Sequence, residues 1–323
     1  MNSLKFEGKG FEFFKIHFIN VIVVFFSLTI LYPWAKVREI KYMCQNTFLA
    51  ENTFTFTGTT SKFFKGYYKI LLLILCLVLF AIAGAKTITL VDPLFRPVLF
   101  TTMILITTVF TCFFVPVIVH GSLNFRLENT SWGNIKPSYT GKLSKIVPLY
   151  FIGMLLTSLT FGIYKAWFQV KLLKYILQNI RFGSLKFNFS GSSQKLFLIY
   201  LKGVLLCLIT FGIYGIWFAK ELYEYTVNNI VVKKDDQEFN LHSNANTLEV
   251  FEMMVGNLLL IVLTLGIGAS WAYMRYYNFI INHCIIPTDF NINSIEEPQE
   301  EEIENVQDAG QNWLDKWNPV FIA

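Results

Sequence analysis

Apolar residues in this chain gather into six long segments that are almost free of ionisable side chains. The segments lie between Lys15 and Lys36, Lys69 and Lys86, Arg96 and His120, Lys145 and Lys165, Lys202 and Lys220, and Glu252 and Arg275. A helix needs roughly 20 apolar residues to cross a hydrocarbon core of about 30 Å. The pattern therefore predicts about six transmembrane helices, in preference to the buried helices of a large soluble protein.

Four of the seven tryptophans stand in one recurring local context. A hydroxyl residue lies seven positions before Trp34, Trp167, Trp217 and Trp271, and a small or polar residue lies fourteen before, namely Asn20, Gly153, Gly203 and Asn257. The sequence Thr-Phe-Gly-Ile-Tyr-x-x-Trp occurs at 160–167 and again at 210–217. Such agreement at fixed offsets predicts a repeated unit of about 50 residues.

Each unit is expected to hold a short extended piece, an apolar helix, a glycine break, a tryptophan and an amphipathic helix. Alternation in Phe54-Thr55-Phe56-Thr57-Gly58 favours a strand for the extended piece. The units are placed at about 6–58, 58–141, 141–191, 191–243 and 243–286. The predicted fold is an all-α membrane protein whose multi-pass domain covers 1–286, with short interfacial helices and small strand-like segments.

The recurring residues have structural interpretations, which we prefer to a ligand site. Glycine at the end of an apolar helix accepts the left-handed conformation that stops it. Tryptophan after that break is typical of the membrane interface. Small residues such as Gly153 and Gly203 permit close contact between helices.

Composition and charge separate a tail from the rest of the chain. The protein is 54% hydrophobic and 15% charged, with a net charge of +5. Residues 287–323 carry −8 of this and the remainder +13, so the tail is predicted to be a disordered acidic extension. The tail is either simply solvated, or its end forms a short anchoring or docking segment through Trp313, Leu314, Trp317 and Phe321. The five scattered cysteines form neither a disulfide framework nor a zinc motif.

The sequence predicts no enzyme, cofactor or metal site, because it lacks metalloprotease, hydrolase, phosphate-loop and dinucleotide motifs. The apolar segments also lack the buried carboxylate that proton-coupled carriers use. Their polar residues include Asn20, Thr108 and Asn257, with further threonines at 101, 107 and 111. The threonines either bond back to their own helices, or these polar residues together line a path through a bundle.

Charged side chains occupy the positions four and seven residues after the recurring tryptophans, except that Asn278 stands seven after Trp271. They are Arg38 and Lys41, Lys171 and Lys174, Glu221 and Glu224, and Arg275. Residues three apart share a helix face. The pairs either form solvated faces of interfacial helices, or the two glutamates meet basic pairs such as Lys171 and Lys174 and tie units together.

The side on which each loop lies is not decided by basic residues, which divide equally between the two sets of loops. Direct copies joined by single crossings would alternate in orientation, yet the loops after Trp34 and Trp167 are alike. Either the units are mutually inverted, as in many transporters, or some apolar helices are re-entrant.

The chain resembles the YjgN-like family of bacterial inner-membrane proteins over roughly residues 4 to 286. The resemblance is carried by Phe-x-Gly-x-Gly at 6–10, Tyr-Pro-Trp-Ala-Lys-Val-Arg at 32–38, and Thr-Phe-Gly-Ile-Tyr before Trp167 and Trp217. It implies a multi-pass protein of the bacterial inner membrane whose activity is not established.

Two functions are compatible with this sequence. The first is a transporter or channel for an unknown solute, with a polar path lined by Asn20, Thr108 and Asn257. The alternative is a membrane scaffold or lipid-organising protein whose acidic tail recruits a partner. The expected partners are membrane lipids, chiefly anionic ones, with a homo-oligomer as a further hypothesis and no nucleic acid.

Overall fold

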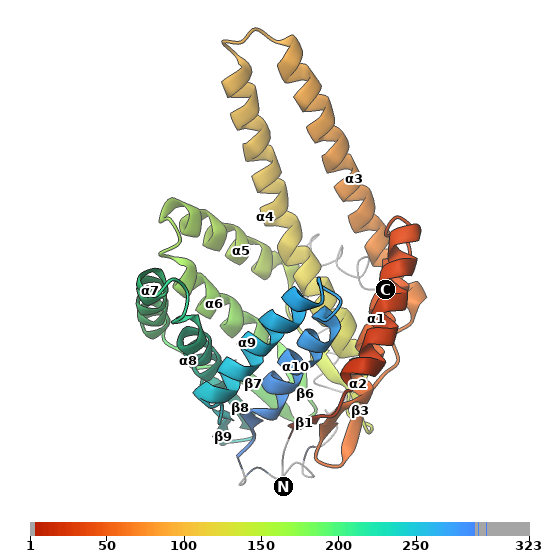
Figure 1. Ribbon diagram of the computed structural model, residues 1–323, viewed down its shortest axis with the longest axis vertical. Helices are drawn as coiled ribbons and strands as arrows, with labels where there is room; N and C mark the ends of the chain where they lie inside the picture. Colours follow the sequence, from red (N-terminus) through yellow and green to blue (C-terminus); the bar gives the residue numbers. More distant parts are fainter. Residues whose placement is uncertain (1–3, 288–289, 291–294, 296–323) are drawn as a thin grey trace.

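The computed structural model describes residues 4–287, 290 and 295, a part of the chain that contains ten helices and eleven short strands (Figure 1). The helices are α1 (Gly10–Phe26), α2 (Tyr32–Gln45), α3 (Thr60–Leu90), α4 (Arg96–Glu128), α5 (Leu143–Leu159), α6 (Lys165–Gln178), α7 (Ser193–Ile209), α8 (Gly215–Asn228), α9 (Thr247–Leu263) and α10 (Ala269–Asn282). The strands are β1 (Leu4–Phe6), β2 (Thr47–Leu49), β3 (Asn52–Phe56), β4 (Thr130–Trp132), β5 (Pro137–Tyr139), β6 (Ile180–Phe182), β7 (Leu185–Phe189), β8 (Ile230–Lys234), β9 (Gln237–Asn240), β10 (His242–Ser243) and β11 (Cys284–Ile285). Nearly all of the acidic tail lies outside the described residues, so its predicted disorder and docking role stay predictions.

Consecutive helices form antiparallel pairs. In α1–α2, α5–α6, α7–α8 and α9–α10, a helix of 17 residues is followed by one of 14. The fifth pair, α3–α4, is much longer, with 31 and 33 residues. Gly162, Gly212 and Gly266 adopt φ of +91°, +89° and +92° in the turns, which confirms the predicted left-handed stops.

The described residues do not confirm the six predicted transmembrane helices. Among the described residues, α3 and α4 are long and apolar enough to cross a membrane, judged by length and composition. A helix of 17 residues extends about 25 Å, less than the roughly 30 Å of a hydrocarbon core. The apolar segments looked longer because each one runs through its turn and into the next helix. The chain therefore folds back after each of these apolar helices.

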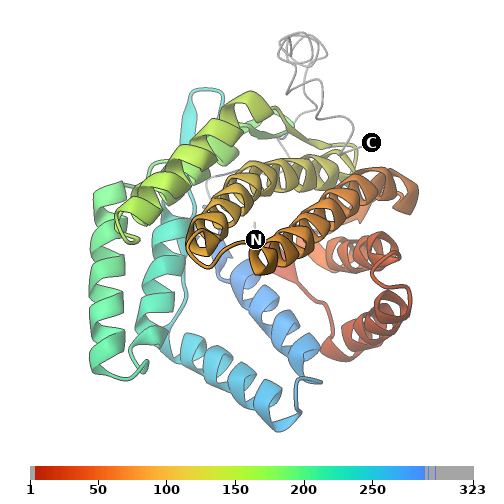
Figure 2. The same ribbon diagram turned by 90° about the horizontal axis from the view of Figure 1, so that it is seen from above.

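The helix pairs follow one another around a ring in chain order (Figure 2). Each pair contacts the next, through α2 with α3, α4 with α5, α6 with α7, and α8 with α9, and α10 contacts α1 to close the ring. The long pair projects well beyond the others (Figure 1). Helix α7 is seen almost end-on in Figure 1 and lengthwise in Figure 2, so it runs nearly perpendicular to the long pair.

The strands gather at the end of the molecule opposite the tip of the long pair (Figure 1). They form antiparallel sheets of order β1-β2-β3-β4 and β5-β6-β7-β8-β9, and a separate β10-β11 pair. The two larger sheets meet in a core that contains Leu49, Trp132, Phe182 and Val232. The expectation of an all-α fold with small strand-like segments is corrected to a mostly helical fold with sheets, because strands from different units pair with one another.

Candidate functional site

In α1–α2, α5–α6 and α7–α8, a tyrosine of the second helix holds the base of the pair. The hydroxyl of Tyr42 donates to the Lys9 carbonyl at 3.0 Å and accepts the Lys9 N–H at 2.9 Å. Tyr175 does the same with Lys142 at 2.8 and 2.7 Å. Tyr225 donates to the Ser192 carbonyl at 2.9 Å. Since Lys9, Lys142 and Ser192 are the N-cap residues of the first helices, each tyrosine fixes where its pair begins.

A Phe-x-Gly sequence before the first helix makes a second contact at the base of a pair. The middle residue donates its N–H to the carbonyl of the asparagine that ends the second helix, at 2.9 Å from Glu7 to Asn46 and 2.8 Å from Thr57 to Asn129. The aromatic ring then folds over the glycine. A Cβ added at Gly8 would lie 2.7 Å from Cε1 of Phe6, so a side chain does not fit there.

The helices of a short pair contact each other in one of two ways. Asn20 and Asn257 donate from Nδ2 to the carbonyls of Ala35 and Ala272, at 3.0 and 3.1 Å. The equivalent positions in the other two pairs are Gly153 and Gly203, and there the rings of Phe168 and Phe218 lie directly against the glycine. An asparagine is thus matched with alanine and a glycine with phenylalanine.

The three residues proposed to line a polar path lie on three different helices. Asn20 is buried and Asn257 half-buried, and both amides are used inside their own pairs. Thr108 is exposed on α4. The structure gives these residues no shared cavity among its described pockets.

Each short pair ends in a tip that exposes a large apolar side chain. The tip residues Leu28, Phe161, Phe211 and Leu265 are 81%, 99%, 98% and 94% exposed. All four adopt a left-handed backbone with φ between 48° and 51°. The turns are built by the hydroxyl that recurs seven residues before each tryptophan, because Thr160 Oγ1 accepts the Tyr164 N–H at 3.0 Å and Thr210 Oγ1 accepts that of Tyr214 at 3.0 Å.

Two of the four recurring tryptophans lie between neighbouring pairs. The ring of Trp167 lies 5.2 Å from that of Phe197 on α7, and Trp271 stacks on Phe14 of α1 at 4.5 Å. Trp34 carries the guanidinium of Arg38 at 4.5 Å, and Trp217 stacks on Tyr214. Sequence reasoning missed the contacts between pairs, since Phe14 and Phe197 are ordinary apolar residues of their helices. Anchoring of the tryptophans at headgroups stays a prediction.

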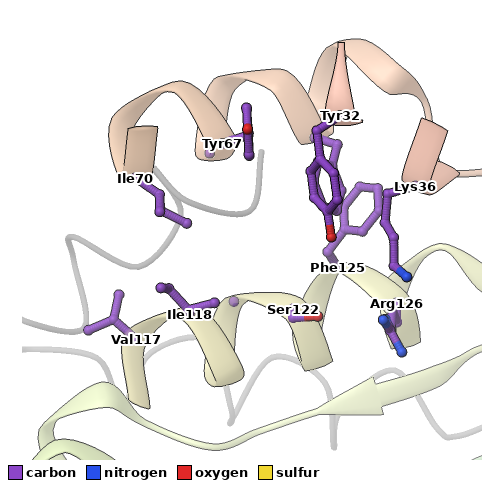
Figure 3. Close-up of a pocket in the computed structure, with 12 residues that line it drawn as sticks. Tyr32, Lys36, Tyr67, Ile70, Val117, Ile118, Ser122, Phe125 and Arg126 are labelled. Carbon is purple, nitrogen blue, oxygen red and sulfur yellow. The ribbon is translucent and has the colours of Figure 1, made fainter. Parts of the chain in front are cut away.

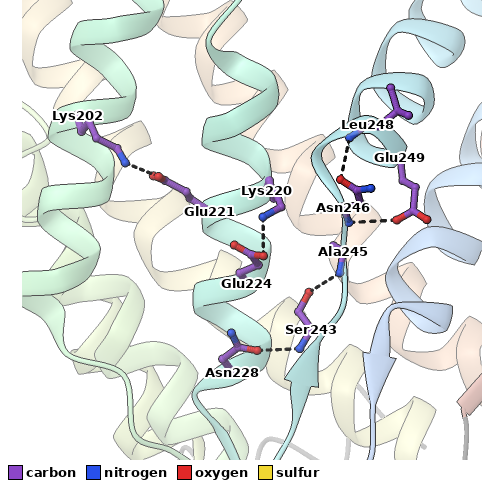
Figure 4. A network of polar contacts seen from close by, with 10 residues as sticks. All are labelled: Lys202, Lys220, Glu221, Glu224, Asn228, Ser243, Ala245, Asn246, Leu248 and Glu249. Carbon is purple, nitrogen blue, oxygen red and sulfur yellow. Dashed lines mark hydrogen bonds and ion pairs between the residues drawn. The ribbon is translucent and has the colours of Figure 1, made fainter.

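The two glutamates among the recurring charged residues form ion pairs within α7–α8 (Figure 4). Glu221 forms an ion pair with Lys202 of α7, and Glu224 with Lys220 at 2.7 Å. Lys171 donates to the hydroxyl of Tyr164 at 2.9 Å, and Arg275 to the carbonyl of Glu252 at 3.3 Å. Lys41 and Lys174 are exposed. The structure therefore gives Glu221 and Glu224 partners other than Lys171 and Lys174.

Groups able to hold a metal or act as a nucleophile are sparse in the described region. It contains no cluster of three or more His, Cys, Asp or Glu side chains with metal-binding geometry. Burial raises the pKa of the Cys284 thiol on β11 to about 11, which makes it a poor nucleophile at neutral pH. That the protein is not an enzyme stays a prediction from the motifs.

Comparison with known proteins identifies a family. No curated protein and no solved structure matches the chain. The family model described as "Bacterial protein of unknown function (DUF898)" matches residues 1–219 and 217–313, which is nearly all of the chain. The protein therefore belongs to this bacterial family of unknown function.

Proposed function

We propose that this protein organises lipids in the bacterial inner membrane, with α3–α4 crossing the bilayer and the four short pairs embedded in one leaflet. The single observation that carries the proposal is the set of exposed apolar tips, Leu28, Phe161, Phe211 and Leu265. Tips embedded in one leaflet would add apolar volume to that leaflet only. Asymmetric insertion of this kind perturbs lipid packing and curvature.

The tips are unfavourable in water for two separate reasons. A left-handed conformation costs a residue other than glycine roughly 1–2 kcal/mol. Leaving a phenylalanine or leucine side chain in water forgoes about 1.5–3 kcal/mol relative to burial. Glycine would remove both penalties, yet each tip has a large apolar residue in this position. Contact with acyl chains offsets the penalties, and this supports lipid as the neighbour of the tips.

The outward faces of the short pairs support the same placement. On α7, Leu198, Val204, Leu205, Leu208 and Ile209 are all more than half exposed. Because α7 lies nearly perpendicular to the long pair, its exposed face would run along the leaflet rather than through it. Interfacial helices bind membranes in this way, with the apolar face among the upper acyl chains.

The distribution of charge gives an orientation. The four short tips at 27–31, 160–164, 210–214 and 264–268 contain no charged residue, whereas lysines and arginines are frequent on the helices and strands towards the base. Basic segments remain on the cytoplasmic side. We therefore assign the strand end to the cytoplasm and the 91–95 turn of the long pair to the other face.

The experiment compares two positions with the same backbone but opposite expected surroundings. Single cysteines at Phe211 and at Asp235, both left-handed and both exposed, are labelled with an environment-sensitive dye in a background without native cysteines. The protein is then placed in vesicles that contain brominated lipids. We expect strong quenching at 211 and none at 235, because Asp235 lies in the turn between β8 and β9.

The functional arm uses the tips themselves. Wild-type protein should deform or tubulate vesicles, and the double variant Phe161→Asp with Phe211→Asp should insert its long pair but deform them much less. Unquenched dye at 211, or deformation that is unchanged in the double variant, would contradict the proposal. Solute flux that does not depend on the tips would instead favour a transporter or channel.

A further inference from the structure

A lateral pocket lies where α2 meets the base of the long pair (Figure 3). It has a volume of about 220 Å³ and is lined by residues of α2, α3 and α4. Tyr32 and Tyr67 form one wall, with ring centroids 5.4 Å apart. Ile70, Val117 and Ile118 form the opposite end (Figure 3). The pocket thus opens between one of the short pairs and the long pair.

One end of the pocket is cationic. Lys36 and Arg126 both line it, and their side chains lie at the same end, past Ser122 (Figure 3). Lys36 Nζ is 3.1 Å from Oε2 of Glu39, so part of its charge is compensated. Arg126 is exposed and makes no ion pair with any residue that the structure describes. A guanidinium with free donors is well suited to bind a phosphate.

The other end of the pocket is apolar and lies at the start of the apolar part of the long pair. Ile70 directly follows Lys69, the last charged residue before Lys86, and Val117 and Ile118 precede His120. The pocket therefore runs across the boundary between charged base and apolar stem. A ligand that fills it must be charged at one end and apolar at the other.

We infer that this pocket binds one anionic phospholipid, with the headgroup phosphate at Arg126 and Lys36 and an acyl chain along Ile70, Val117 and Ile118. The inference rests on the membrane placement of the proposed function. The surrounding bilayer supplies such a molecule directly. A free phosphate ion would use the cationic end but leave the apolar end empty.

Lipid retention on the detergent-solubilised full chain tests this site. The protein is titrated with dioleoyl phosphatidylglycerol, or with zwitterionic dioleoyl phosphatidylcholine, and bound lipid is counted by native mass spectrometry. We expect one phosphatidylglycerol to be retained about tenfold more tightly than phosphatidylcholine, since both carry a phosphate but the choline cation of phosphatidylcholine would lie beside the like charges of Lys36 and Arg126. Arg126→Gln should abolish the preference, whereas Lys41→Gln, an exposed lysine of the same α2, should preserve it.

A second variant keeps both charges and fills the space. Ser122→Phe places a ring between the two ends of the pocket, and we expect the tightly held phosphatidylglycerol to be lost while the melting temperature is kept. The site would be refuted by equal retention of the two lipids, by no effect of Arg126→Gln, or by displacement of the lipid with millimolar inorganic phosphate. Since retention is measured in micelles, these outcomes leave the quenching of tip-bound dye in vesicles unaffected, and the two proposals fail separately.

Discussion

Adding one methyl group at Gly203 is expected to disturb the contact between α7 and α8. The Cβ of Gly203→Ala would lie 2.6 Å from Cγ of Phe218 and nearer still to two other carbons of that ring. Real Cβ atoms do not approach other carbons this closely, so the ring or the helix must move. Overpacking of this kind costs about 1–3 kcal/mol.

A matched control is present in the same helix pair. Gly215 is the first residue of α8, and a Cβ added there meets only Sγ of Cys207, at 4.0 Å. Gly215→Ala should therefore be neutral or stabilise by up to about 1 kcal/mol through helix propensity. The two substitutions add the same group to the same hairpin and differ only in what it meets.

The contact predicts a specific rescue. Phe218→Ala removes the ring and leaves a gap, so alone it destabilises. Gly203→Asn combined with Phe218→Ala recreates the arrangement in which Asn20 donates to the Ala35 carbonyl. We expect the double variant to be more stable than the sum of the single changes implies, by about 1 kcal/mol or more.

Melting temperatures of the purified protein in detergent measure all of these variants. A change of 1 kcal/mol moves the melting temperature of a domain of 150–250 residues by about 2–4 °C. Equal melting temperatures for Gly203→Ala and Gly215→Ala would refute the packing argument. Strict additivity in the double variant would refute the idea that asparagine with alanine and glycine with phenylalanine are alternative solutions.

Two further predictions concern the base of the molecule. Tyr175→Phe should destabilise the protein by about 1–3 kcal/mol, because it leaves the N–H and carbonyl of Lys142 without the hydroxyl that both now contact. Tyr68→Phe, at an exposed ring, should not change the melting temperature. Equal effects of the two substitutions would count against the capping role of Tyr175. The rate of alkylation of Cys284, measured by peptide mass spectrometry, should rise about tenfold per pH unit from pH 8 to pH 10, since a pKa of about 11 keeps most of the thiol protonated over this range. A rate that stops rising near pH 9 would contradict the burial of this thiol.

The local features of the fold were accessible to sequence reasoning because short-range physics determines them. Gly162, Gly212 and Gly266 end their helices as predicted, since only the backbone at those positions is involved. Alternation in 54–58 correctly indicated a strand. The pairing of β3 with β4 was not foreseen, because Phe54 and Trp132 come together only after the long pair has formed between them.

The sequence has more apolar segments of transmembrane length than the described residues have helices of that length, for a definite reason. A hydropathy profile does not reveal a turn that is made of apolar residues. In residues 160–164 the chain reverses through Phe161, Gly162 and Ile163, and these residues continue the apolar segment of α5 without interruption. A segment of transmembrane length was therefore counted where the structure has a helix of 17 residues and a turn.

One side of the contact between paired helices could be predicted from the sequence. Asn20, Gly153, Gly203 and Asn257 were recognised as small or polar positions, but their partners directly after each tryptophan were overlooked. The residue after the tryptophan is alanine where the first helix has asparagine, and phenylalanine where it has glycine, as at Ala35, Phe168, Phe218 and Ala272. This correlation predicts the contacts. The pocket at Arg126 carried no signal of its own, because Lys36, Tyr67 and Arg126 are far apart in the chain and ordinary in their local contexts.

Closure of the ring makes the order of units along the polypeptide partly arbitrary. The N–H of Phe6 donates to Asn282 Oδ1 at 2.8 Å, Asn278 donates to the Phe6 carbonyl at 3.0 Å, and Phe14 stacks on Trp271, so the first and last units adjoin like any other neighbours. A circularly permuted chain that starts at the loop before β7 would retain all five contacts between neighbouring helix pairs. Deletion of the opening residues would instead leave α10 with an uncovered flank, although it is separated from them by more than 250 positions.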